Sequence, residues 1–254
     1  MKLRVLGCSG GIGGNQRTTS FLLDHDILID AGTGVGELSL AELGAIDHIF
    51  ITHSHLDHIA CIPLMIDSVW MMRDHPITIY ATAETLEIIQ QHIFNWKIWP
   101  DFSQIPNAQR PAMRYQVIQL GHAVELNGRK ITPVPANHVV PAVGYQLDSG
   151  KASLVYSGDT TSNDALWVVV NKIENLRYLI IEAAFSNHEK ELAVLSKHLC
   201  PELLAVELSK FNHQAEVFIT HLKPDELELT MQEIEQCLAD RQPKMLLNNH
   251  VFEF

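Results

Sequence analysis

The stretch HSHLDH at residues 53–58 contains three histidines and one aspartate within six positions. Imidazole nitrogens and carboxylate oxygens are among the side-chain atoms that bind divalent metal ions. The alternative is a hydrated surface loop that happens to be rich in histidine. The density of these residues favours a metal site over that alternative.

The strand that precedes this stretch positions it for chemistry. Residues 46–52 read IDHIFIT, an apolar and β-branched run that is typical of a buried strand. Loops at the carboxyl ends of strands are where α/β sheets place functional residues. From such a loop His53 and His55 can turn toward one cation, while Asp57 and His58 at the start of the next helix point toward a second position. The spacing therefore predicts two metal ions.

The same stretch resembles the HxHxDH motif of the metallo-β-lactamase superfamily. The resemblance implies an α/β fold of four layers, an αββα sandwich with two mixed β-sheets between outer helices and the metals at one edge. A chain of this length can bury a sizeable core, and residues 1–254 are expected to form a single domain of this kind. Asp30, in an Asp-Ala-Gly segment, is expected to support the metal site from behind rather than to bind metal.

The resemblance also implies where the remaining ligands lie. The family has a third histidine, then an aspartate that bridges both metals, then a last histidine, each at the end of a strand-like segment. His138, Asp159 and His221 occur in this order and context, although each alone would more often be a cap or turn residue. The implied ligand set is His53, His55 and His138 for one metal and Asp57, His58 and His221 for the other, with Asp159 between them.

This donor set contains nitrogen and carboxylate ligands but no thiolate. Zinc suits it best, and manganese or iron would accept the same ligands. Such a pair of metals is expected to activate a bridging water and to clamp the oxygens of the group under attack. Lactams, thioesters and phosphodiesters can all be cleaved in this way. The substrate must therefore be inferred from residues outside the ligand set.

Glu182 and His198 provide that information. Glu182 begins a Glu-Ala-Ala-Phe segment and His198 follows it, and phosphodiesterases of the superfamily carry a similar Glu-Ala-x-Phe segment followed by a histidine. The resemblance implies that His198 protonates the leaving oxygen while Glu182 orients it. The alternative is that His198 only flanks the helix that begins near Pro201. His198, Glu182 and Asp57 are the expected catalytic residues.

Other stretches are similar to class II cyclic-nucleotide phosphodiesterases, namely HLDH, the opening LGCSGG and residues 92–106. Cys61 departs from that class, whose signature has glycine at this position. The predicted function is a dinuclear-metal phosphodiesterase that hydrolyses 3′,5′-cyclic AMP or GMP to the nucleoside 5′-monophosphate through a metal-bridging hydroxide. Trp96, Trp99 and Phe185 are candidates for stacking on the base, although aromatic residues at such spacing are more often core residues.

Three other functions stay open. A ribonuclease Z-like enzyme acting on RNA ends has the same metal shell, but it usually carries a tRNA-gripping arm between the third histidine and the bridging aspartate. Only residues 139–158 lie there, and two strands and their turn occupy most of them. A thioester or lactam hydrolase would not need the distant acid His198. A non-catalytic metal-binding or sensory module has no positive feature in the sequence.

Charge and composition limit the partners. The formal net charge is -12, and no cluster of Lys and Arg offers a basic footprint, so a long nucleic acid is not expected and a small anionic phosphodiester is. A homodimer stays open. No segment is apolar and long enough for a signal peptide or membrane span, which predicts a cytoplasmic protein without membrane contact. The four cysteines lack a CxxC pair and are expected to be reduced thiols.

Hydrophobic periodicity predicts the elements that must position these residues. Strands are expected near residues 2–7, 19–30, 46–52, 76–81, 114–118, 129–135, 143–156, 177–182, 215–220 and 244–247. Helices are expected near residues 35–43, 57–72, 83–95, 163–172, 201–211 and 225–239. Residues 100–111 resemble a linker. The glycines of residues 10–14 lack the lysine of a phosphate-binding loop and are expected to form a tight turn.

Overall fold

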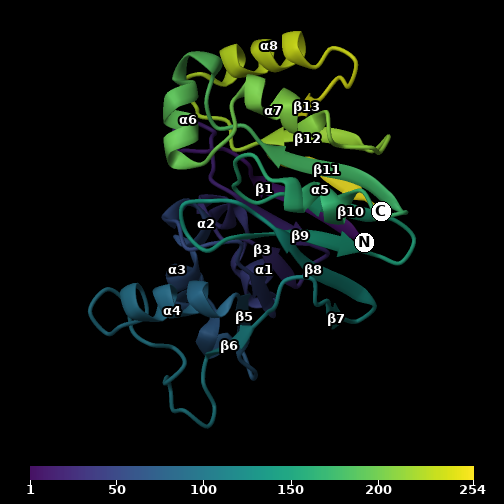
Figure 1. Ribbon diagram of the computed structural model, residues 1–254. Coiled ribbons are helices and arrows are strands. Elements are labelled where there is room, and N and C mark those ends of the chain that lie inside the picture. The colour runs from purple at the N-terminus through teal and green to yellow at the C-terminus, as the bar shows by residue number, and fades with distance from the viewer.

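Several strands of this protein are buried at every position, which requires cover on both faces of their sheets. The computed structural model describes residues 1–254, and in it β2 (Ser20–Leu23), β3 (Ile27–Ile29), β5 (Ile77–Ala81) and β10 (Ser153–Tyr156) have no exposed residue. Two seven-stranded sheets pack against each other, and helices cover their outer faces (Figure 1). The predicted four-layer fold is confirmed.

The first sheet is mixed. Its strands in spatial order are β14 (Val251–Glu253), β1 (Lys2–Gly7), β2, β3, β4 (His48–Phe50), β5 and β6 (Met113–Val117). The pairs from β14 to β3 are antiparallel, and those from β3 to β6 are parallel. The two ends of the chain therefore meet in one sheet, because β14 pairs with β1.

The second sheet is mixed in the same way. Its strands in spatial order are β13 (Lys244–Met245), β12 (Glu216–Thr220), β11 (Leu176–Glu182), β10, β9 (Val143–Asp148), β8 (Arg129–Pro135) and β7 (Val124–Leu126). The strands from β10 to β13 are parallel, while β7, β8, β9 and β10 alternate in direction. It follows that β8, β10, β11 and β12 all run in the same direction and end at one edge of the sheet.

Helices form the two outer layers (Figure 1). On the side of the first sheet are α1 (Leu40–Gly44), α2 (Leu56–Ile59), α3 (Ile62–Val69) and α4 (Ala83–His92). On the side of the second sheet are α5 (Asp164–Val170), α6 (Lys190–Ser196), α7 (Pro201–Leu208) and α8 (Leu227–Cys237). Three short 3-10 helices are η1 (Thr33–Glu37), η2 (Trp70–Met72) and η3 (Asn187–Glu189).

Three hydrophobic clusters fill the spaces between the four layers. Neighbouring residues of a strand point to opposite faces of its sheet. Accordingly, Ile49 of β4 belongs to the cluster under the first set of helices, whereas Phe50 belongs to the cluster between the sheets. In β11, Ile180 packs between the sheets and Ile181 packs under the second set of helices. The strands that lead to the candidate site are thus held from both sides.

Several predicted elements are corrected by the structure. The single strand predicted over 19–30 is two antiparallel strands, because the backbone turns at Asp24 with a φ of 53°. The helix predicted over 57–72 is divided into α2, α3 and η2, and α3 starts afresh with a proline in its first turn. The helix predicted over 35–43 is η1 followed by α1, which Ser39 and Glu42 begin with a capping box. The sequence interpretation missed β7, β14 and α6.

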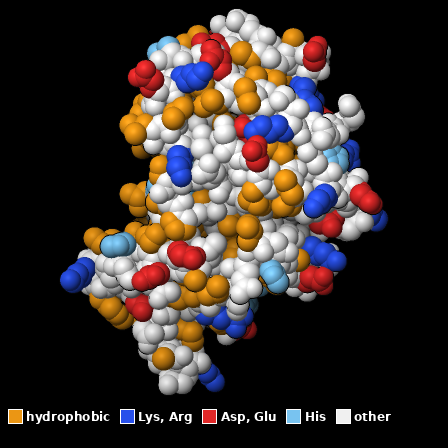
Figure 2. All heavy atoms as spheres, viewed as in Figure 1, with side chains coloured by type: hydrophobic (Ala, Val, Ile, Leu, Met, Phe, Trp, Pro, Cys, Tyr) orange, Lys and Arg blue, Asp and Glu red, His pale blue; other side chains and the backbone are white.

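Charged side chains are mixed on the surface. On the face shown in Figure 2, Lys and Arg side chains lie among Asp and Glu side chains and do not gather into one basic patch. The formal net charge of the chain is -12. This face therefore lacks the electrostatic footprint that a long nucleic acid would require.

Candidate metal centre

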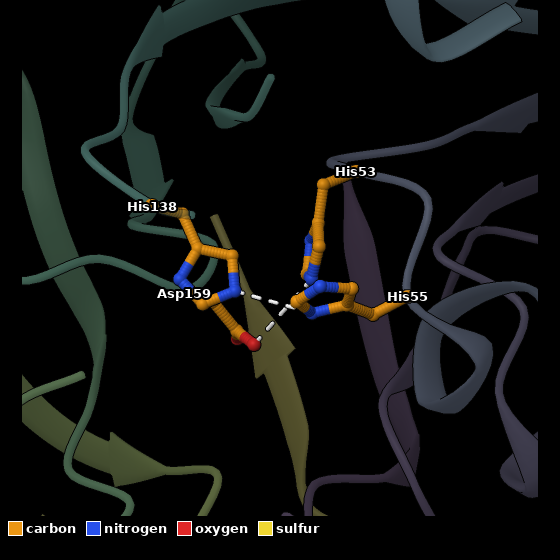
Figure 3. A group of neighbouring side chains, drawn as sticks. All are labelled: His53, His55, His138 and Asp159. Carbon is orange, nitrogen blue, oxygen red and sulfur yellow. Dashed lines mark hydrogen bonds and ion pairs between the residues drawn. The ribbon is translucent and has the colours of Figure 1, made fainter. Parts of the chain in front are cut away.

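The loops that carry the predicted ligands meet at one edge of the sandwich. The HSHLDH stretch follows β4, and His138, Asp159 and His221 follow β8, β10 and β12. Since β8, β10 and β12 end at the same edge of the second sheet, their loops face the loop from the first sheet across the interface. Figure 3 shows His53, His55, His138 and Asp159 pointing toward one another there.

The structure brings all seven predicted ligands into two adjoining groups. Within each group the candidate ligand atoms lie within 4.8 Å of one another. One group is His53, His55, His138 and Asp159, and the other is Asp57, His58, Asp159 and His221. Asp159 belongs to both, so a single carboxylate lies between two sets of imidazoles. The division between the groups matches the one that the family resemblance implied.

Asp159 is buried, and three imidazoles lie around one of its carboxylate oxygens. Its Oδ2 lies 2.8 Å from Nε2 of His221, 3.3 Å from Nε2 of His58 and 3.6 Å from Nε2 of His53. Burial alone would raise the pKa of this carboxyl group, but the charges of His221 and His58 outweigh burial and hold the pKa well below its usual value. Asp159 is therefore a carboxylate with several donors around it.

Buried polar atoms without a hydrogen-bond partner test whether this donor set fits a metal. They include Nε2 of His53, Nε2 of His58 and Oδ1 of Asp159. Leaving such atoms unsatisfied costs free energy, so they indicate a missing partner. Burial also lowers the pKa of His53 and of His138, which favours the neutral imidazole that binds a metal ion. At His58 the charges of Asp159 and Asp30 outweigh burial and raise the pKa, so this ring would lose a proton when it binds a cation. The donor set fits divalent cations.

Groups behind the imidazoles fix their orientation. His58 Nδ1 lies 2.7 Å from Oδ2 of Asp30, and His138 Nδ1 lies 3.0 Å from the carbonyl oxygen of Lys197. Thr52 Oγ1 lies 3.0 Å from Nδ1 of His53. With Nδ1 engaged in each ring, Nε2 is the nitrogen left to face the centre. Asp30 lies behind His58, where the resemblance predicted a supporting residue.

A glycine allows the last histidine to take its place. His221 has a φ of 64°, and a Cβ added at Gly10 would lie 2.5 Å from His221 Nδ1. The turn after β1 can therefore approach His221 only because position 10 has no side chain. The sequence interpretation predicted a tight turn here, but no signal in the sequence linked Gly10 to His221.

Glu182 and His198 are paired beside the two groups. His198 Nδ1 lies 2.8 Å from Oε1 of Glu182, which is fully buried and accepts backbone N–H groups from Thr160, Ala184 and Leu199. Burial lowers the pKa of His198, but the Glu182 carboxylate raises it by more, so the net shift is upward. The ring of His198 is 4.9 Å from that of His138 and 5.1 Å from that of His221. His198 is thus a buried imidazole next to, but outside, the candidate ligand set.

The aromatic candidates for base stacking are placed differently from one another. Phe185 is only 9% exposed, and the ammonium group of Lys223 lies 5.8 Å above its ring. Trp99 packs against the core under the first set of helices, whereas Trp96 is 64% exposed. Phe185 therefore supports its neighbours and offers no free face to a base.

Cys61 is accommodated where the class II signature has glycine. Its φ is -90°, a conformation that any residue can adopt, and its N–H donates to the carbonyl oxygen of Ala31 at 2.9 Å. The half-buried side chain packs against the first core. The structure therefore gives no reason for glycine to be required at this position.

None of the helices could cross a lipid bilayer, since the longest, α8, has 11 residues.

Sequence comparison finds relatives over most of the chain. The family model of the beta-lactamase superfamily domain matches residues 25–250. A probable 3′,5′-cyclic-nucleotide phosphodiesterase from Yersinia pestis is 28% identical over 222 residues, which cover 76% of this chain and 63% of the relative. A 3′,5′-cyclic-nucleotide phosphodiesterase from Aliivibrio fischeri is 28% identical over 250 residues, or 81% of this chain and 73% of the relative. The chain thus spans less than two thirds of the Yersinia protein.

A ribonuclease Z from Haloarcula marismortui is 31% identical over 158 residues, which cover 58% of this chain and 47% of the relative. Among solved structures, unliganded yeast PDE1 matches 100% of this chain and 99% of its own with a TM-score of 0.83 at 19% identity. At that identity the likeness concerns the fold.

Proposed function

The chain belongs to the beta-lactamase superfamily, a family of hydrolases, and from this membership and the geometry of the site we propose that it is a dinuclear-metal phosphodiesterase acting on 3′,5′-cyclic nucleotides. The observation that carries the proposal is the pairing of His198 with Glu182 at 2.8 Å, outside the candidate ligand set. An alkoxide that leaves a phosphodiester needs a proton, whereas a thiolate that leaves a thioester does not.

We assign the metal ligands by group. His53, His55 and His138 would hold one divalent cation, Asp57, His58 and His221 the other, and Asp159 both. Zinc is the metal that this donor set suits best, and manganese or iron would also be accepted. Such ions, when bound, activate water for attack and neutralise charge on the phosphate oxygens.

The protein's own groups complete the mechanism. Glu182 engages Nδ1 of His198, so Nε2 is the atom that delivers a proton to the departing 3′-oxygen. The upward shift in the pKa of His198 favours the protonated imidazole that this step requires. The side chain of Asp57 is 30% accessible, whereas those of His53 and His58 are fully buried, and we therefore place Asp57 on the substrate side of the site. The product would be a nucleoside 5′-monophosphate.

A small substrate is favoured over a long nucleic acid. Residues 139–158, where a tRNA-gripping arm would be inserted, are occupied by β9, β10 and the loops that join them to the site. The net charge of -12 opposes a polyanion. Two relatives named as cyclic-nucleotide phosphodiesterases support the smaller substrate. The second candidate is a ribonuclease Z-like activity on RNA ends, supported by the relative from Haloarcula marismortui.

The proposal is tested by turnover. Protein loaded separately with zinc and with manganese is assayed with 3′,5′-cyclic AMP, 3′,5′-cyclic GMP, bis-p-nitrophenyl phosphate, a precursor tRNA with a 3′ trailer and an acyl thioester. Release of the 5′-monophosphate is expected with at least one cyclic nucleotide. His53→Ala should abolish this activity, and His122→Ala, which alters an exposed histidine, should leave it unchanged. Cleavage of the precursor tRNA or the thioester without hydrolysis of either cyclic nucleotide would contradict the proposal.

A further inference from the structure

Two half-buried lysines, Lys197 and Lys223, flank His198, and neither forms an ion pair with a carboxylate. We propose that they form an anion clamp, defined as the ammonium groups of these two residues, which binds the negatively charged phosphate of the substrate on the His198 side of the candidate metal centre. The inference rests on the proposed function, since it assigns residues that recognise the phosphodiester. It adds a binding role for two side chains outside the metal ligands and the proton donor.

Lys223 is held over the site by two contacts. Its Nζ donates to the carbonyl oxygen of Gly10 at 2.7 Å and lies 5.8 Å from the centre of the Phe185 ring. Phe185 in turn lies 5.7 Å from the ring of His198, and Gly10 packs directly on His221. Both groups that hold the ammonium therefore border the candidate site. Burial and the charge of Lys223 act to lower the pKa of His198, against the stronger effect of Glu182, which is consistent with this proximity.

Lys197 directly precedes His198 in the chain and lies next to His138. Its backbone has a φ of 54° at the carboxyl end of α6, and its carbonyl oxygen accepts a hydrogen bond from His138 Nδ1 at 3.0 Å. Its Nζ lies 3.2 Å from Oδ1 of Asn137 and 3.2 Å from the carbonyl oxygen of His138. The side chain therefore turns back over the loop that carries His138, and its charge is held beside the backbone of this candidate ligand.

Lys197 and Lys223 are half-buried without a carboxylate partner, whereas the other lysines that lack one, Lys2, Lys97, Lys151 and Lys172, are exposed. The chain has 30 acidic residues and 18 Lys and Arg residues, so partners are plentiful, and Lys190, Lys210 and Lys244 each lie 2.7 Å or less from a carboxylate oxygen. Lys197 and Lys223 are instead held by carbonyl and amide oxygens, which position an ammonium group without cancelling its charge. A partly buried charge without a counter-ion favours binding of an anion.

The donors that remain suit a phosphate group. An ammonium has three protons; Gly10 takes one from Lys223, and two oxygens approach Lys197. Each lysine can therefore still donate to an oxygen of a phosphodiester monoanion. Because the phosphate is charged both before and during the reaction, the clamp should strengthen binding of substrate and transition state alike. Its loss should raise KM and leave kcat nearly unchanged.

The test compares three matched variants of the metal-loaded protein. Lys197→Met and Lys223→Met remove one charge each, and Lys190→Met removes the same charge from a lysine on α6 that Glu202 already neutralises. Steady-state constants are measured with bis-p-nitrophenyl phosphate and 3′,5′-cyclic AMP, and the Kd for adenosine 5′-monophosphate is measured by calorimetry. Thermal denaturation of each variant establishes that the fold is retained.

Loss of either clamp lysine is expected to raise KM and the calorimetric Kd about tenfold, with kcat within about twofold of wild type. Added salt should weaken binding less in these variants than in wild type. Lys190→Met should match wild type. The inference would be overturned if Lys197→Met and Lys223→Met had the same KM and Kd as Lys190→Met, or if they lowered kcat at an unchanged KM. If only bis-p-nitrophenyl phosphate is hydrolysed, the proposed function fails, and the KM for that diester tests the anion clamp. If neither substrate is hydrolysed, the Kd for adenosine 5′-monophosphate tests the anion clamp.

Discussion

Asp30 and His58 form a hydrogen bond with no exposure to solvent, in which Nδ1 of His58 lies 2.7 Å from Oδ2 of Asp30. The backbone N–H and the hydroxyl of Thr52 also donate to this carboxylate. The bond holds the proton of His58 on Nδ1 and leaves Nε2, 3.3 Å from Asp159, free to face the candidate metal centre. A residue in the loop after β3 therefore orients an imidazole on α2.

Asp30→Asn should weaken metal binding. An amide can present its NH2 group where the carboxylate oxygen accepts the proton of His58, which would disfavour the tautomer that points Nε2 inward. We expect the affinity for zinc to fall by about 10- to 100-fold, as measured by competition with a chromophoric chelator. Asp67→Asn, which alters an exposed carboxylate on α3, is the control. Equal affinities in the two variants would contradict the assigned role of Asp30.

Removal of metal should destabilise the protein. The buried Nε2 atoms of His53 and His58 have no hydrogen-bond partner, so a cation that satisfies them binds the folded state in preference to the unfolded chain. At a free zinc concentration about 1,000 times the Kd, the gain in the free energy of unfolding should be about 4 kcal/mol. Thermal denaturation in EDTA and after zinc is restored measures the effect, and an identical Tm in both states would argue against a metal centre.

His198→Ala should reduce the turnover rate by an amount that depends on the leaving group of the substrate. The departing ribose oxygen of a cyclic nucleotide needs a proton, so turnover of 3′,5′-cyclic AMP should fall by about 100- to 10,000-fold. The nitrophenolate of bis-p-nitrophenyl phosphate leaves without a proton, so its turnover should fall far less. Rates for both substrates are measured on the same metal-loaded sample. Equal losses with the two substrates would show that His198 is not the proton donor.

Glu182→Gln should shift the pH dependence of activity. The active form of His198 is protonated, so activity declines as the pH rises through the pKa of its imidazole. The Glu182 carboxylate raises that pKa against the effect of burial, and removal of its charge should therefore lower it. The descending limb of the kcat/KM profile should move to lower pH. A limb that keeps its position would exclude electrostatic support of His198 by Glu182.

Asp26 and Arg129 should make stability depend on acid pH. The carboxylate of Asp26 accepts from Nη2 of Arg129 at 2.8 Å, and although burial acts to raise the pKa of Asp26, the guanidinium outweighs it and lowers the pKa. A carboxyl group whose pKa is lower in the folded protein than in the unfolded chain stabilises the folded state at any pH above the unfolded pKa of about 3.9. This contribution is lost as the pH falls from the unfolded pKa through the pKa in the folded protein.

Asp26→Asn should therefore reduce the free energy of unfolding at pH 7 by about 2 kcal/mol. The difference from wild type should shrink as the pH falls below about 4, where Asp26 of the unfolded chain takes up a proton while the folded carboxylate, with its lowered pKa, is still ionised. Urea denaturation at pH 7, 5 and 3.5 measures this difference. A difference that is constant with pH would show that the charge of Asp26 does not contribute.

The sequence predicted most of the strands because they depend on local patterns, and the family resemblance implied the order of the candidate ligands along the chain. The apolar run before His53 and the one before His221 each predicted a strand with a histidine at its end, and β4 and β12 are those strands. The predictions that were wrong concern short or polar segments. β7 has no buried residue, so it carries little hydrophobic signal. The strand predicted over 19–30 ran through the polar residues Asp24, His25 and Asp26, where the chain turns between two apolar runs.

The sequence by itself determined the chemistry of the site, since ligand type and spacing in residues 53–58 are properties of adjacent side chains. Only the tertiary structure decided which imidazole each supporting group contacts, including Asp30, which the family resemblance had placed behind the site. Asp30 reaches His58 across 28 positions, the Lys197 carbonyl reaches His138 across 59, and Lys223 reaches Gly10 across 213. These contacts depend on how two sheets bring the ends of distant strands to one edge, and two of them use backbone carbonyl groups that every residue possesses. No local pattern of side chains can therefore predict them.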